Sequence, residues 1–343
     1  MTDKLHTVLL FALPASGKSE VRTYLDSETF LGRLEGESPV GPTLQLDDYP
    51  YVHTMHRLDD ELHARGYEYL FYQGPDRPFV DQYEWGTLME LLNEGYDDLL
   101  ANNVVETNQA AQLLMDRIDA ARSKVGLDPD LGMIPYRDRC EIAAVLEDEA
   151  QEFLAEKNRQ CCQEPAGKTI FIEAARGGPH GAGKPLVPPR GYAYALSKLS
   201  DQILDNSVVI YIWVDPAESR RKNRDRGKPD AQGSILHHMV PLEVMLGEYG
   251  TDDMDHLLAT SKKENHIQVD RLIVVEGEDG EKRFGEKTWF LPAAKFDNRS
   301  DLTTFVRKSD EPGWPMANAD HIHAELIKAL AILKSGWDAR GRG

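Results

Sequence analysis

Two kinds of hydrophobic pattern divide the chain. Uninterrupted apolar runs stand at residues 7–13 (Thr-Val-Leu-Leu-Phe-Ala-Leu) and 208–214 (Val-Val-Ile-Tyr-Ile-Trp-Val). Runs of this length are typical of strands that are buried on both faces, as in a parallel sheet. Shorter runs at 43–46, 169–173 and 293–296 predict further strands.

Between residues 50 and 165 the pattern is helical instead. Apolar residues recur three or four positions apart, as in Leu88, Leu91 and Leu92, which is the spacing of one buried helix face. The same spacing predicts a closing helix at 321–333. Runs at 271–276 and 284–291 flank Glu-Asp-Gly, which predicts a hairpin.

Strands separated by helical stretches indicate an α/β fold, because parallel strands need crossover connections. We therefore expect a three-layer αβα sandwich with a core formed by residues 1–49 and 166–334. The segment 50–165 is too long for one crossover and is predicted to be a helical insertion on the substrate side. A lid and hairpin insertion is expected at about 228–287, and a disordered tail at 335–343.

Charge and composition narrow the possible partners. The 343 residues include 58 acidic and 39 basic side chains, for a net charge of −19. Such a surface would repel a phosphate backbone, so nucleic acid is an unlikely partner. No apolar stretch is long enough to span a membrane, and the first residues lack the layout of a signal peptide. Cys140, Cys161 and Cys162 show no metal-ligand spacing. These features predict a cytoplasmic protein that binds no membrane, and they leave a homo-oligomer open.

A glycine-containing turn, Pro14-Ala-Ser-Gly-Lys-Ser19, follows the first predicted strand and precedes a helical pattern. In a phosphate-binding loop, backbone N–H groups surround the phosphates, the Lys contacts their oxygens and the Ser ligates Mg²⁺. Ala12 stands where the usual pattern has its first Gly, and a small residue can still turn. A chance turn is the alternative. The residues predicted to bind the nucleotide are Pro14, Ala15, Ser16, Gly17, Lys18 and Ser19. Lys18 is also predicted to be catalytic, and Ser19 to be a metal ligand.

Carboxylates follow the second and third predicted strands. Asp47 and Asp48 come after the second and Glu173 ends the third, at the edge where open α/β sheets bind ligands. A carboxylate there can accept the proton of an attacking hydroxyl or hold Mg²⁺. A helix cap or an ordinary acidic turn is the alternative. We predict Asp47 and Asp48 as catalytic residues that the sequence cannot separate, and Asp47 and Glu173 as metal ligands.

Arginines are concentrated after the last strongly apolar run. Arg220 and Arg224 stand four residues apart, which places them on one helical face, and Arg221 and Arg226 are nearby. Guanidinium groups stabilise the charge of a transferred phosphoryl group. We therefore predict Arg220 and Arg224 as catalytic, and Arg221 and Arg226 as nucleotide-binding residues of a lid. A solvated charged helix is the alternative.

Three further residues are candidate substrate contacts. Arg176 follows Glu173 in Glu-Ala-Ala-Arg-Gly-Gly, where it could contact an anionic substrate. Arg190 and Tyr192 belong to Arg-Gly-Tyr-Ala-Tyr, a candidate lining of the acceptor site for which ordinary packing is the alternative.

With these residues the chain resembles the P-loop kinases of small molecules, the group around uridine kinase, phosphoribulokinase and the zeta toxins. The resemblance covers about a quarter of the chain and rests on the loop at 14–19, on Leu46-Asp-Asp-Tyr49, on Val214-Asp-Pro with its arginines, and on Phe296-Asp-Asn-Arg299. It implies a P-loop NTPase sandwich with a parallel sheet in the order 2-3-1-4-5. It also implies a catalytic carboxylate after the second strand, and it places Asn298 in a turn that borders adenine.

The function that the resemblance implies is ATP- and Mg²⁺-dependent phosphoryl transfer to a hydroxyl of a small molecule, such as a nucleoside, a sugar or a related metabolite. Both insertions depart from the group and leave the acceptor open. A nucleotide-dependent switch or scaffold that hydrolyses ATP slowly is an alternative that the size of the helical insertion favours, whereas the clustered arginines favour a kinase. Phosphorylation of a polynucleotide 5′-hydroxyl is disfavoured by the charge of −19.

Overall fold

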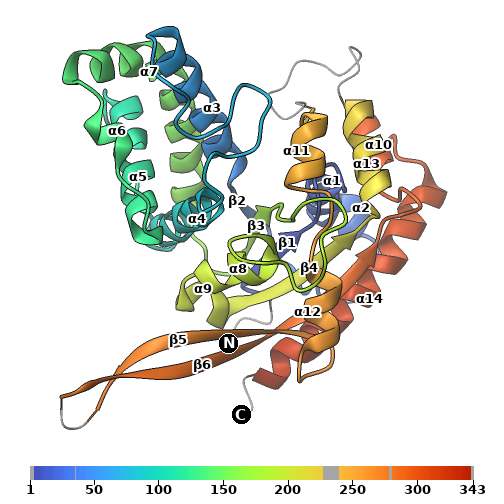
Figure 1. The fold of residues 1–343 in the computed structure, drawn as a ribbon. Helices are drawn as coiled ribbons and strands as arrows, with labels where there is room; N and C mark the ends of the chain where they lie inside the picture. The colour runs from blue at the N-terminus through green and yellow to red at the C-terminus, as the bar shows by residue number, and fades with distance from the viewer. Residues whose placement is uncertain (1–3, 35, 227–238, 278–279, 341–343) are drawn as a thin grey trace.

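The computed structural model describes residues 4–34, 36–226, 239–277 and 280–340 of the chain. Within these residues one six-stranded sheet runs through the molecule in the order β2-β3-β1-β4-β6-β5, and helices pack on both of its faces (Figure 1). The strands are β1 (Thr7–Phe11), β2 (Thr43–Asp47), β3 (Thr169–Ala174), β4 (Ser207–Trp213), β5 (His266–Glu276) and β6 (Lys282–Asp297). All neighbouring pairs are parallel except β5 and β6, which are antiparallel. The predicted α/β class is confirmed, and the arrangement is compatible with a three-layer sandwich.

The end of the sheet differs from the sequence-based expectation. The runs predicted as two strands, 284–291 and 293–296, form the single strand β6 on both sides of Pro292. This strand pairs with β5 as far as Pro292 and with β4 from Ala293 onward. Pro292, which lacks an N–H group, lies where the pairing passes from one partner to the other. The predicted five-stranded order is therefore extended by an antiparallel sixth strand, and the β5–β6 hairpin projects from the sheet as a long arm (Figure 1).

The helices of the described residues are distributed over the whole chain. They are α1 (Lys18–Leu25), α2 (Glu28–Leu31), α3 (Tyr49–Ala64), α4 (Glu84–Leu100), α5 (Ala110–Val125), α6 (Asp130–Met133), α7 (Tyr136–Cys161), α8 (Gly191–Lys198), α9 (Asp201–Asn206), α10 (Pro216–Arg226), α11 (Leu242–Gly247), α12 (Met254–Thr260), α13 (Thr304–Lys308) and α14 (Met316–Arg340). None of these helices carries an apolar stretch that could cross a lipid bilayer.

Alternate residues of the central strand β1 point into two different cores. Leu9 and Phe11 pack with α4, α8 and α9, whereas Val8 and Leu10 pack with α1, α13 and α14. Both faces of β1 are thus covered, which explains why its sequence is apolar throughout.

The C-terminal residues correct another expectation. The disordered tail predicted from residue 335 is helical as far as Arg340, because α14 continues beyond the predicted end at 333. The Arg340 guanidinium reaches back to the sheet and donates hydrogen bonds to the carbonyl oxygens of Phe290 and Ser207. The residues after Arg340 lie outside the described part of the chain.

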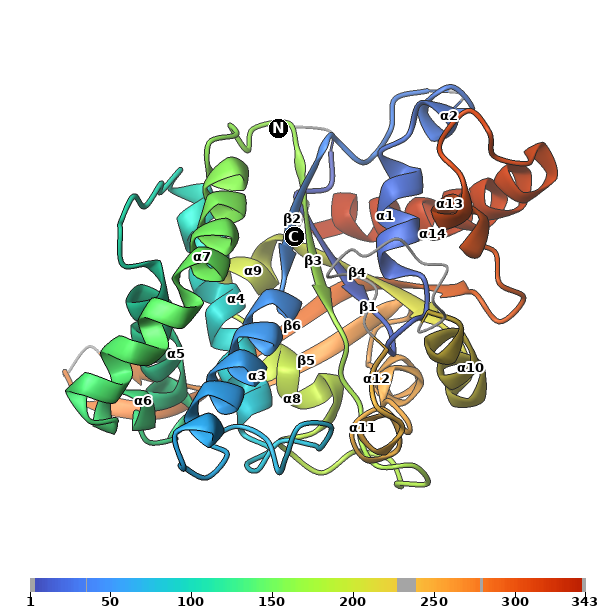
Figure 2. The same ribbon diagram turned by 90° about the horizontal axis from the view of Figure 1, so that it is seen from above.

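Helices α3 to α7 form a body of their own beside the β2 end of the sheet, away from α1, α13 and α14 (Figures 1 and 2). They enclose a third apolar core that includes Leu58, Leu88, Leu114 and Leu146. These are residues of the kind that made the sequence pattern helical between 50 and 165, and the side chains at that spacing do face one interior.

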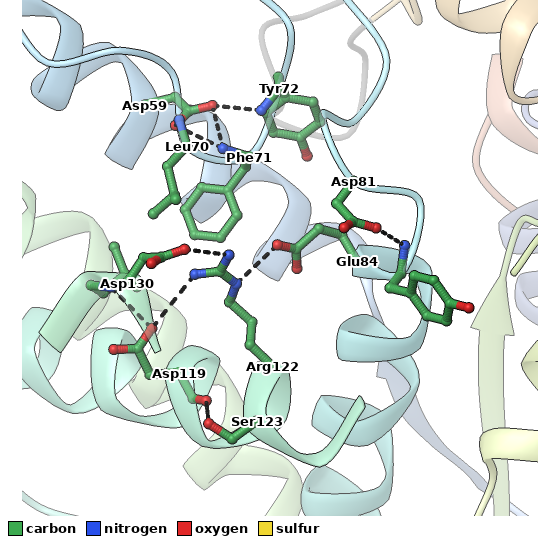
Figure 3. A network of polar contacts seen from close by, with 12 residues as sticks. Asp59, Leu70, Phe71, Tyr72, Asp81, Glu84, Asp119, Arg122, Ser123 and Asp130 are labelled. Atoms are coloured by element: carbon green, nitrogen blue, oxygen red, sulfur yellow. Dashed lines mark hydrogen bonds and ion pairs between the residues drawn. The ribbon is translucent and has the colours of Figure 1, made fainter. Parts of the chain in front are cut away.

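A buried arginine ties this helical body together (Figure 3). Arg122 of α5 pairs with Glu84 of α4 at 2.9 Å and with Asp130 of α6 at 2.9 Å, and its guanidinium lies 5.4 Å from the centre of the Phe71 ring. Burial raises the pKa of Glu84 to about 7, and the charge of Arg122 works against this shift. Arg122 and Glu84 are buried, whereas Asp130 reaches the surface, so the cluster joins three helices from the interior outward.

Two further carboxylates of this body hold backbone segments. Asp59 of α3 accepts hydrogen bonds from the backbone N–H groups of Leu70, Phe71 and Tyr72, as Figure 3 shows. Asp119 accepts two more from the start of α6. Each buried carboxylate is thereby satisfied by donors, as buried polar groups require.

Candidate functional site

The turn after β1 adopts a left-handed backbone at two positions. Ala15 has a φ of 58° and Gly17 a φ of 99°, and α1 begins directly after Gly17. A Cβ atom at Gly17 would lie 2.4 Å from Thr303 Oγ1 and 2.8 Å from Asn298 Nδ2. Glycine is therefore required at this position both by the backbone angle and by the space available.

The backbone N–H groups of this turn are available to a ligand. Those of Ala15, Ser16 and Gly17 donate to no other residue that the structure describes. Left-handed residues within such a turn direct successive N–H groups into a concave anion site, and the N-terminus of α1 adds its partial positive charge. The geometry is suited to a phosphate group.

Side chains from distant parts of the chain support the turn from behind. Asn298 Nδ2 donates to the Ser16 carbonyl oxygen at 2.8 Å, and Ser219 Oγ of α10 donates to the Pro14 carbonyl oxygen at 2.8 Å. Asn298 is completely buried, and its Oδ1 accepts a hydrogen bond from the Leu302 N–H at 2.7 Å. The side-chain amide of Asn298 is therefore engaged inside the protein, and the prediction that its turn borders adenine rests on the backbone alone.

Glu173 gathers three polar side chains beneath the start of α1. Its Oε1 accepts from Arg22 Nε at 2.9 Å and from Gln45 Nε2 at 3.3 Å, and its Oε2 accepts from Ser19 Oγ at 3.3 Å. Ser19 and Glu173, which the sequence nominates separately as metal ligands, are thus in hydrogen-bond contact although 154 positions apart.

Asp47 lies next to Glu173, because the two are register partners on β2 and β3. Its Oδ1 accepts a hydrogen bond from the Tyr49 N–H at 2.9 Å. Burial, followed by the carboxylates of Glu173 and Asp48, raises the pKa of Asp47 to about 8, although the Tyr49 hydrogen bond and the charge of Lys18 lower it. Asp47 is consequently a much stronger proton acceptor than an ordinary carboxylate.

Asp48 has a different environment from Asp47. Its Oδ2 pairs with Arg176 Nη1 at 2.5 Å, and both side chains are buried. The Arg176 guanidinium lies 4.8 Å from the centre of the Trp85 ring and donates to the Ala175 carbonyl oxygen at 2.7 Å. This ion pair makes the two aspartates different. Asp48 has a cationic partner in Arg176, whereas Asp47 lies beside the carboxylate of Glu173. The ion pair also occupies Arg176, which the sequence proposes for an anionic substrate.

The two predicted acceptor residues after β3 have different surroundings. Tyr192 is completely buried; its hydroxyl donates to the Ala12 carbonyl oxygen at 3.0 Å and accepts from the Arg176 N–H at 3.2 Å. It holds the ends of β1 and β3 together, so its expected place in the acceptor site is wrong. Arg190 is half-buried at the start of α8, and its Nε is buried with no hydrogen-bond partner among the described residues.

Arg221 of α10 belongs to a solvated charged helix face, which was the alternative interpretation of this arginine-rich segment. Its guanidinium pairs with Glu218 and with Asp225 on the same helix, each at 2.6 Å. Arg221 is exposed, so these contacts form a solvated charged face rather than part of a site.

The other arginines of α10 are placed differently. Arg220 is half-buried, and its Nη1 is buried without a hydrogen-bond partner among the described residues. Arg224 is exposed. The side chain of Arg226 and the residues 227–238, where the predicted lid begins, lie outside the described part of the chain.

A cavity of about 770 Å³ lies between β2 and the helices α3, α4, α5 and α7. On the sheet side it is lined by Ser19, Arg22, Gln45 and Asp47, and farther in by apolar side chains of the helical body. Sequence reasoning missed this cavity: periodicity predicts which helix faces are buried, not whether those faces meet. Gly95, which lines it from α4, is a signal of reduced packing within an apolar helix face.

The polar side chains beside the glycine-containing turn are compatible with Mg²⁺ binding. No three His, Cys, Asp or Glu side chains form a ready-made metal cage within the described residues. Mg²⁺ does not need one, since it is usually held by one or two carboxylates together with phosphate oxygens and water. Ser19, Asp47 and Glu173 fit that set, although Arg22 already occupies one oxygen of Glu173.

Comparisons of the chain with models of known protein families, with curated proteins and with solved structures found no match.

Proposed function

We propose that the protein is a P-loop kinase that transfers a phosphoryl group from ATP to a hydroxyl of a small molecule. The observation that carries the proposal is the left-handed turn at the start of α1 next to the Ser19–Glu173–Asp47 cluster. The turn suits a chain of phosphates, and the cluster suits a metal ion and contains a proton acceptor. Phosphoryl transfer needs all three functions.

Each residue has a role in this proposal. The N–H groups of residues 15–17 and the Lys18 ammonium bind the phosphates of ATP. Ser19 and Glu173 would hold Mg²⁺, which neutralises phosphate charge when bound, and this leaves Asp47 as the proton acceptor. The hydroxyl of the acceptor attacks the γ-phosphorus, a new P–O bond forms, the bond to ADP breaks, and Asp47 accepts the hydroxyl proton.

The arginines of α10 are the proposed contacts of the transferred group. The hydrogen bond from Ser219 to the Pro14 carbonyl oxygen supports this role, because it attaches α10 to the back of the turn. Among them we retain Arg220 and Arg224, whereas Arg221 is engaged with Glu218 and Asp225.

The proposal is tested by calorimetric titration of Lys18→Ala with Mg-ATP. Loss of a charged donor to phosphate should weaken binding by about 10- to 100-fold, while the melting temperature stays the same. Lys328→Ala, which removes an exposed lysine of α14 paired with Glu325, is the matched control and should bind as the parent does. Unchanged affinity in Lys18→Ala would reject the phosphate-binding turn.

The rate of ADP formation then separates a kinase from a switch. A kinase consumes ATP in proportion to an added acceptor, whereas a switch hydrolyses ATP at a rate that no acceptor changes.

A further inference from the structure

We propose that the acceptor is an alcohol with an apolar body, and that the cavity beside β2 holds that body while the hydroxyl reaches Asp47. This inference rests on the proposed function, because it names the substrate class of the same site.

The first argument is continuity. Ser19 and Asp47, two members of the site cluster, line the same cavity as Leu91 of α4 and Met115 of α5. A molecule in the interior of the helical body is therefore in one space with the proposed proton acceptor. No separate channel has to be assumed between the binding pocket and the reacting groups.

The second argument is the chemistry of the wall. Every lining residue that α4 and α5 contribute is apolar or glycine, including Leu92, Gly95, Leu99 and Leu114. A nucleoside or a sugar carries hydroxyl groups around its ring, and each one buried against such a wall without a partner is unfavourable. An aliphatic or aromatic body loses nothing there and gains from leaving water.

The third argument is the position of the polar residues. They enter the lining from the sheet with Gln45 and Asp47, from α1 with Ser19 and Arg22, and from α3 and α7, where Arg57 pairs with Glu149 at 3.1 Å. The pocket is thus amphipathic, and its polar end on the sheet contains the proton acceptor. Its volume of about 770 Å³ falls within the ~300–1,000 Å³ typical of small-molecule sites.

The test uses straight-chain primary alcohols of increasing length as probes. Calorimetry on the nucleotide-free protein should show an affinity that rises about fourfold for each added CH₂ until the pocket is filled. With Mg-ATP present, ADP formation and a phosphorylated alcohol should follow the same order of chain length.

Variants that place a larger side chain inside or outside the cavity provide the matched comparison. Ala150 of α7 lines the pocket, whereas Ala155 of the same helix is exposed and does not line it. Ala150→Phe should lower alcohol affinity at least about tenfold and leave Mg-ATP affinity unchanged, and Ala155→Phe should change neither. Ala111→Leu, a smaller filling from α5, should give an intermediate loss if Ala150→Phe proves too unstable to measure.

The outcomes distinguish this inference from the function on which it rests. Chain-length-dependent binding and turnover that Ala150→Phe abolishes support the inference. Tight Mg-ATP binding without alcohol binding overturns the inference and leaves the kinase proposal standing. Alcohol binding without Mg-ATP binding overturns the kinase proposal, and the assignment of the alcohol as its acceptor with it.

Discussion

Two clusters of charged side chains among the described residues are built on different principles. Around Arg122, carboxylates from α4, α5 and α6 share one guanidinium, and Asp119 also accepts backbone N–H groups. Beside β2, the carboxylates of Asp47 and Glu173 lie next to each other in register, and one of them, Asp47, has a pKa of about 8.

The difference supports the proposal that the second cluster performs the chemistry. Ions that are surrounded by fixed opposite charges hold a structure together, and they gain little from a ligand. Glu173 is paired with Arg22, but two neighbouring carboxylates are still unfavourable when both are ionised, as the raised pKa of Asp47 reflects, and a cation or a proton relieves this repulsion. The proposed function thus assigns a structural role to the cluster of the helical body and a reactive role to the cluster at the edge of the sheet.

Of the substitutions proposed for the two clusters, Asp47→Asn should have the largest effect. It should lower the activity without lowering the stability. Removing the proton acceptor should slow ADP formation with an accepted alcohol by roughly 10²- to 10⁴-fold. The unfolding free energy should stay equal or rise, since one of the mutually repelling carboxylates is gone. Asp48→Asn is the control: it should destabilise the fold because it leaves Arg176 buried without its partner. A stable, fully active Asp47→Asn would show that this cluster is not reactive.

Arg122→Met should have the reverse effect. It leaves the carboxylates of Glu84 and Asp119 buried without their cation, which should lower the unfolding free energy by about 3–5 kcal/mol. Urea unfolding measures this loss, and calorimetry on the still-folded protein should find the same Mg-ATP affinity. A loss below about 1 kcal/mol would contradict the structural role of this cluster.

Glu84→Gln should give the smallest effect, visible as a pH dependence. The pKa of Glu84 is about 7 in the folded protein against 4.5 ordinarily, so between these values the folded state binds more protons than the unfolded state. The stability contributed by protonated Glu84 is therefore lost as pH rises through this window, by at most about 3 kcal/mol. In Glu84→Gln this part of the decrease should be absent when unfolding is compared at about pH 5 and about pH 8. Identical pH profiles of the two proteins would argue against a raised pKa.

How much could be predicted from the sequence depends on whether a residue's environment is set by its neighbours along the chain. Uninterrupted apolar runs located β1 and β4 because both faces of a central strand are buried. The positions of Asp47, Ser19 and Glu173 at strand ends and at a helix start predicted that these side chains share a site, and the structure brings them together. The carboxylates could be nominated but not distinguished, since only the Arg176 contact separates Asp48 from Asp47.

Residues whose role depends on distant neighbours were assigned less well. Asn298 and Tyr192 carry polar groups that suggest a ligand, yet both are buried and bonded to backbone carbonyls. The runs on either side of Pro292 were predicted as two strands, because nothing local reveals that they form one strand with two different partners. The cavity is a property of how helices pack against one another, which single-helix periodicity does not contain.

The turn at residues 14–17 also bears on how the protein is made. Its supports are Ser219, Asn298 and Thr303, which are synthesised about 200 to 290 residues later. A nascent chain that has emerged only as far as the helical body contains the complete motif but none of these supports. The proposed capacity to bind a phosphate should therefore arise late in biosynthesis, once β4 and β6 have joined the sheet and α10 has packed against the turn. Nucleotide binding would then report that the entire sheet is assembled, and the motif alone would not.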